Sequence, residues 1–87
     1  MSIRENFGQR LKMLRKHKGM SQDDISFASG VDRSYLSEIE NGKSSPTIDM
    51  VDKIARALNI APNEFFIFDV SEPKTDYDGE PLNTVKE

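Results

Sequence analysis

Capping residues and glycines mark the starts and ends of short helices along residues 1–68 of this chain. These start and stop signals restrict the fold more than any other feature of the sequence. Ser21 followed three residues later by Asp24 is the pattern of an N-terminal capping box, and Asp32 and Thr47 are typical N-cap residues. Gly30 can take the positive φ that a tight turn between two helices requires. These signals predict helices over about residues 22–29, 33–41 and 48–58.

The spacing of apolar residues predicts a helix before these three, and a proline predicts one after them. Apolar residues spaced four, four and three positions apart form one face of an amphipathic helix that Gly19 ends: Ile3, Phe7, Leu11 and Leu14. Pro62 suits the first position of a fifth helix, but Ala61 offers no side-chain acceptor for its cap. We therefore expect this helix to be weaker by about 1 kcal/mol than one with a serine cap. The expected fold class is all-α, with five helices.

Length and composition limit the chain to one small domain. With 87 residues, 36% of them hydrophobic, it has material for a single modest core. The absence of cysteine excludes disulfides and the common zinc sites. We expect a folded domain over residues 1–68 and an acidic C-terminal tail over residues 69–87, either disordered or a dimerisation arm. No apolar run approaches the roughly 20 residues of a membrane span, and no signal segment is present, so a cytoplasmic location is expected.

Charge is distributed unevenly along the chain. Residues 1–18 hold six basic residues and one acidic residue, a balance of +5, although the whole chain has a formal net charge of −3. Residues 19–68 and 69–87 each carry −4. A basic end beside acidic remainders suits a face turned toward phosphate, but a solvated helix face explains the same charges.

A linked set of residues between positions 7 and 65 has the spacing of two helices joined by a short turn. The set consists of Leu11, Leu14, Arg15, Gly19, Ser21, Gln22, Ile25, Ala28, Gly30, Val31, Ser34, Tyr35, Leu36, Ser37, Ile39, Glu40, Asn41, Gly42 and Pro46. It resembles the helix-turn-helix DNA-binding domains of the Cro and phage-repressor type, the Xre family. The resemblance implies a lambda-repressor-like domain. The stretch from Asp32 to Ser37 is similar to controller proteins of restriction-modification systems.

The resemblance implies that the helix over residues 33–41 enters the major groove with its N-terminal residues toward the bases. Arg33 is the strongest candidate reader, because a guanidinium can bind O6 and N7 of guanine together. Gln22 is expected to contact a phosphate and to brace this helix, and Asp32 is expected to cap it, whereas the role of Glu38 stays open. The residues expected at the DNA are Gln22, Asp32, Arg33, Ser34, Tyr35, Ser37, Glu38, Asn41, Lys43, Ser44 and Ser45.

Two further contacts are expected, one inside the domain and one between two copies of the chain. The resemblance places Arg15 and Glu40 on an inner contact between helices, as a largely buried ion pair. The run from Phe65 to Phe68 is apolar on every side of a helix, which is more than one core face can absorb. We assign Phe65 to the core and expect a dimer interface formed by Phe66, Ile67 and Phe68.

The expected function is that of a sequence-specific regulator of transcription that binds a pseudo-palindromic operator in duplex DNA as a homodimer. One alternative is an antitoxin that binds a toxin through the aromatic segment and acidic tail, and also binds its own operator. Another is a protein-interaction module that has lost DNA binding. His17 stands alone, and the neighbouring Asp23 and Asp24 point different ways on a helix. We therefore expect no catalysis, no metal, no cofactor, no small-molecule substrate and no membrane partner.

Overall fold

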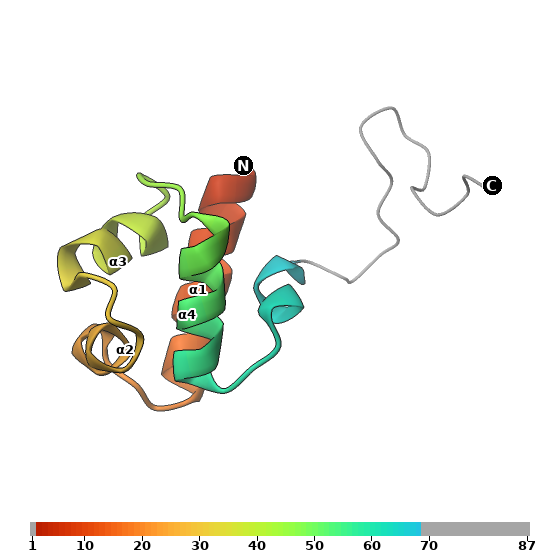
Figure 1. Ribbon diagram of the computed structural model, residues 1–87. Helices are drawn as coiled ribbons and strands as arrows, with labels where there is room; N and C mark the ends of the chain where they lie inside the picture. The colour runs from red at the N-terminus through yellow and green to blue at the C-terminus, as the bar shows by residue number, and fades with distance from the viewer. Residues whose placement is uncertain (1, 69–87) are drawn as a thin grey trace.

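The computed structural model describes residues 2–68, all of whose regular elements are helical. The elements are α1 (Ile3–His17), α2 (Gln22–Ser29), α3 (Arg33–Glu40), α4 (Ile48–Leu58) and a short 3-10 helix, η1 (Pro62–Phe66). Helices α2 and α3 lie on one side of the α1 and α4 pair, and η1 lies on the other side (Figure 1). The all-α prediction is confirmed for this part of the chain. The predicted tail over residues 69–87 lies outside the described residues.

The predicted helix starts are present as hydrogen-bonded caps. The Ser21 hydroxyl accepts from the Asp24 N–H at 3.0 Å, and the Asp24 carboxylate accepts from the Ser21 N–H at 2.8 Å. The hydrogen bond that the Ser21 N–H donates to the charged carboxylate is the main cause that lowers the pKa of Asp24 below its usual value. Helix α2 spans the predicted residues, and Thr47 caps α4 by accepting from the Met50 N–H. The same reciprocal cap opens α1 between Ser2 and Glu5.

Three predicted details are wrong. The fifth helix is a 3-10 helix of five residues, a form that occurs in short pieces; Pro62 is its first residue, and Ala61 provides no side-chain cap. Helix α3 ends at Glu40, and Asn41 is its C-cap instead of its last residue. Ile3 is 63% exposed, since an apolar stripe reaches the core only over the length that other helices cover.

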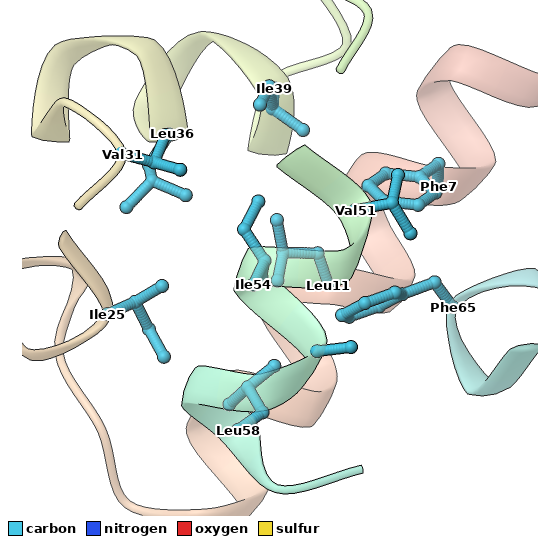
Figure 2. Packing of buried hydrophobic residues seen from close by; sticks show 11 residues of the cluster. Phe7, Leu11, Ile25, Val31, Leu36, Ile39, Val51, Ile54, Leu58 and Phe65 are labelled. Atoms are coloured by element: carbon cyan, nitrogen blue, oxygen red, sulfur yellow. The ribbon is translucent and has the colours of Figure 1, made fainter. Parts of the chain in front are cut away.

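The hydrophobic core lies between all five helical elements. Figure 2 shows Phe7 and Leu11 from α1 converging with Ile54 and Leu58 from α4. Side chains from the other elements complete the cluster: Ile25, Val31, Leu36, Ile39, Val51, Ala55 and Phe65. The prediction that Phe65 is a core residue is confirmed, because its side chain is fully buried with its ring 5.1 Å from that of Phe7.

Gly8 allows α1 and α3 to approach at backbone distance. A Cβ atom at position 8 would overlap the carbonyl oxygen of Ile39 and would lie 2.8 Å from that of Glu40. Any side chain at Gly8 would therefore push the C-terminal end of α3 away from α1. The position of α3 relative to the core depends on this glycine.

Candidate nucleic-acid interface

Helix α3 buries one face and exposes the other. Leu36 and Ile39 point into the core, whereas Arg33 and Ser34 are exposed at the N-terminal end of the helix (Figure 2 shows the buried side chains). The Asp32 carboxylate accepts from the Ser34 N–H at 3.1 Å, which confirms the predicted cap. An exposed helix end that carries polar side chains has the shape that enters the major groove in helix-turn-helix complexes.

A buried network fixes α3 against the two preceding helices. Arg15 Nε donates to Glu40 Oε2 at 2.6 Å, Arg15 Nη2 donates to Glu40 Oε1 at 3.0 Å, and both residues are buried. The hydrogen bonding that Arg15 donates to the Glu40 carboxylate raises the pKa of Arg15. Gln22 Nε2 donates to the same Glu40 Oε1 at 3.0 Å, so the start of α2 is bonded to the end of α3. One amide hydrogen of Gln22 is thereby used inside the protein, and the other is available to a ligand.

The loop after α3 is bonded to side chains of that helix. Tyr35 Oη donates to the carbonyl oxygen of Ser45 at 2.7 Å. Ser44 Oγ donates to Glu38 Oε1 at 2.6 Å, and the N–H of Lys43 donates to the Glu38 carbonyl at 2.8 Å. These contacts give Glu38 a structural role at the loop, the role that its sequence left open. Lys43 remains exposed at the tip of the loop.

Arg33 is already paired on the protein surface. Its Nε lies 2.7 Å from Asp23 Oδ1 in the first turn of α2, and both side chains are more than half exposed. Arg10, by contrast, is held away from α3, because its Nε donates to the Glu64 carbonyl at 2.8 Å on the η1 side of the fold. Arg10 therefore adds no charge to the α3 face.

An apolar groove lies between the N-terminal parts of α1 and α4, the loop that precedes α4, and η1. It has a volume of about 130 Å³, and its apolar lining includes Ile3, Phe7, Pro46, Ile48, Val51 and Phe66. Phe66 is 46% exposed and Ile67 is 37% exposed, whereas Phe68 is partly covered. Sequence reasoning missed Ile48, which is 82% exposed directly after the Thr47 cap. It also missed Phe27 on α2, which is 94% exposed.

A second, polar cavity of about 250 Å³ is lined by Glu5, Gln9, Lys12, Glu40 and Asn41. Between residues 2 and 68, no group of three or more histidine or acidic side chains is placed to hold a metal ion. None of the helices in that same range is both long and apolar enough to cross a membrane.

Comparison with known proteins decides the family. The sequence profile described as Helix-turn-helix matches residues 11–65, which include α2, α3 and α4 completely. The chain belongs to the helix-turn-helix family. The resemblance to Xre-type regulators is thereby confirmed, and the helix-turn-helix unit proper is α2, the turn at Gly30 and α3.

Several relatives of this helix-turn-helix protein are controller proteins. The control protein C.BamHI of Bacillus amyloliquefaciens is 35% identical over 68 residues, which cover 77% of this chain and 84% of that protein. The restriction-modification controller protein C.AhdI from Aeromonas hydrophila, known from a crystal structure, is 44% identical in sequence to this chain and matches its fold with a TM-score of 0.71. The match covers 72% of this chain and 96% of C.AhdI. The controller protein C.Esp1396I, solved as a tetramer in complex with its natural 35 base-pair operator, is 30% identical with a TM-score of 0.69. That match covers 76% of this chain and 87% of that one.

Proposed function

We propose that this helix-turn-helix regulator binds a specific operator in duplex DNA through the exposed N-terminal half of α3. The observation that carries the proposal is the buried network of Arg15, Glu40 and Gln22, which holds an α3 with exposed polar residues at a fixed angle. Preorganised placement of a recognition helix lowers the entropy lost on binding. The operator complex of the related C.Esp1396I supports the same use of the fold here.

The residues of this face have separate proposed roles. Arg33 reads a guanine through two hydrogen bonds, which discriminates against a wrong base by roughly 1–3 kcal/mol. Ser34 and Ser37 make less selective contacts to bases or phosphates. Gln22 and Lys43 contact phosphates on either side of α3.

The loop residues act partly through the fold. Tyr35, Glu38 and Ser44 fix the loop by the hydrogen bonds described above, and this presents Asn41 and Ser45 to the phosphate backbone. Phosphate contacts position a protein on DNA, whereas base contacts specify the sequence. We therefore assign sequence preference to α3 and general affinity to the loop.

The regulator acts as a homodimer in this proposal. The half-exposed Phe66 and Ile67, with Ile3 and Ile48 at the neighbouring groove, form an apolar surface that a second copy would cover. The exposed N-terminal end of α3, with Arg33 and Ser34, contributes no residue to this surface, so pairing through it leaves that end of both recognition helices free. Two such helices would meet half-sites about 34 Å apart, and a two-fold dimer requires a pseudo-palindromic operator.

Selection from random duplexes tests the proposal. The wild-type chain should enrich an inverted repeat, and Arg33→Ala should lose the preference at one base pair of each half-site. Arg56→Ala is the matched control, because Arg56 is also an exposed arginine paired with an aspartate, but lies on α4. No enrichment by the wild type, or an equal effect of the two alanine variants, would contradict the proposal.

Salt dependence separates specific readers from general phosphate contacts. Lys43→Ala should weaken binding to all duplexes alike and reduce the slope of log K against log salt by about 1, because one phosphate contact is lost. The base preference of the Lys43→Ala variant should match that of the wild type. A changed base preference would place Lys43 among the readers instead.

A further inference from the structure

The carboxylate of Asp23 is placed against the proposed base reader. Asp23 Oδ1 lies 2.7 Å from Arg33 Nε, and this contact joins the first turn of α2 to the first turn of α3. Asp23 is not needed as the helix cap, because Ser21 and Asp24 already form the reciprocal cap of α2. Besides its favourable position in the first turn of α2, the specific side-chain contact of Asp23 is therefore the one with Arg33.

The contact uses the inner edge of the guanidinium. Arginine has five N–H donors in a rigid fork, and the Asp23 carboxylate contacts this fork at Nε. A ligand can still reach the N–H donors of the terminal nitrogens, because the Arg33 side chain is 58% exposed. A carboxylate at Nε thus limits the rotation of the side chain, while the two nitrogens that can bind guanine O6 and N7 stay within reach of a ligand.

We propose that Asp23 is a positioning residue that holds Arg33 in a base-reading orientation; this inference rests on the proposed function. An arginine side chain loses rotamer freedom when it is ordered, and Asp23 makes the Arg33 side chain lose part of that freedom before DNA binds, so less is lost on binding. The effect belongs to the base pair that Arg33 reads and to no other position of the operator.

Asp23 also acts on selectivity through its charge. A carboxylate beside Arg33 repels phosphate oxygens, so the guanidinium gains less from a non-specific contact with the DNA backbone than a free arginine would. Specificity is a difference of affinities, and weakening the wrong complex increases it. Removal of the Asp23 charge therefore strengthens binding to unrelated DNA while it weakens discrimination at the guanine.

The experiment uses the full chain and a labelled duplex enriched from the random selection. Anisotropy titrations compare this duplex, the same duplex with the Arg33-dependent base pair replaced, and a scrambled duplex. Asp23→Asn should reduce the preference for the original base pair by about three- to tenfold, within the limit set by arginine rotamer entropy. It should also tighten binding to the scrambled duplex. Asp52→Asn is the matched control, since Asp52 pairs with Arg56 at 3.1 Å on α4. This control variant should change neither the preference for the original base pair nor the affinity for the scrambled duplex.

The double variant shows whether Asp23 acts through Arg33. In an Arg33→Ala background, Asp23→Asn should change the base-pair preference by less than twofold, and Asp23→Glu alone should retain part of the wild-type preference. Thermal unfolding of Asp23→Asn should match that of the wild type, because an exposed pair contributes little stability. An unchanged or increased preference in Asp23→Asn, while Arg33→Ala abolishes that preference, would overturn this inference alone. An Arg33→Ala variant that keeps the preference would overturn both this inference and the proposed reader.

Discussion

Breaking the buried pair of Arg15 and Glu40 should remove a large part of the stability of the domain. In Arg15→Met the Glu40 carboxylate stays buried but loses both donors of the guanidinium, and it keeps the Gln22 amide as its one remaining side-chain donor in the described structure. An uncompensated buried charge of this kind costs about 3–5 kcal/mol. A domain of this size is stable by roughly 3–10 kcal/mol, so the variant should be marginally folded or unfolded at room temperature.

Urea unfolding followed by helical circular dichroism measures this loss. The double variant Arg15→Met with Glu40→Leu removes both charges and should recover most of the loss, because a well-packed apolar pair is often as stable as a buried ion pair. Trimethylamine N-oxide added to all samples keeps weak variants in the measurable range. Arg56→Met is the matched control, because its exposed pair with Asp52 should contribute at most about 1 kcal/mol.

Two results would refute this reasoning. If Arg15→Met lowers the free energy of unfolding by less than about 1 kcal/mol, the Glu40 carboxylate is not the uncompensated charge that its burial implies. If the double variant is no more stable than Arg15→Met, the loss comes from packing of the arginine side chain and not from the charge left behind.

Four other variants, one of them a control, test separate parts of the fold. Gly8→Ala should cost about 1–3 kcal/mol and weaken DNA binding, because the added methyl group meets the α3 backbone; an unchanged thermal midpoint would contradict this close contact. Phe65→Ala should cost about 3–5 kcal/mol in urea unfolding, whereas substitution of the exposed Phe27 by serine should stay within about 0.5 kcal/mol. Asp24→Asn should reduce stability at neutral pH, but the difference from the wild type should vanish in acid. The pKa of Asp24 is lowered by folding, so its contribution is present above its unfolded-state pKa and is lost as the pH falls through its folded-state pKa. A difference that persists at low pH would show that the substitution acts through something other than the charge.

Local signals in the sequence predict the helices well. The reciprocal cap of Ser21 and Asp24 depends on residues three positions apart, so the pattern can be read without knowledge of the fold. The cap of α1 has the same signal, Ser2 followed by Glu5, and could have been predicted in the same way. The weak fifth helix was also predictable from Ala61, although its 3-10 form was not.

Contacts between helices could not be predicted from local patterns. The pair of Asp23 and Arg33 and the hydrogen bond from Ser44 to Glu38 depend on the angle between elements, which spacing along the chain does not define. The family resemblance brought Arg15 and Glu40 together, because that contact belongs to the shared fold. It gave no information on Phe27, since an exposed aromatic side chain follows from no core pattern.

The contact of Arg10 with Glu64 would limit which operators the proposed dimer can bind. Arg10 bonds both the backbone and the side chain of Glu64, which fixes η1 to α1, and Gly8 brings the same helix against α3. The exposed aromatic residues and the reading residues are thus connected through one continuous helix instead of a hinge. If two copies pair through η1, an operator with one base pair inserted between its half-sites must supply the adjustment itself, by twisting or bending the DNA.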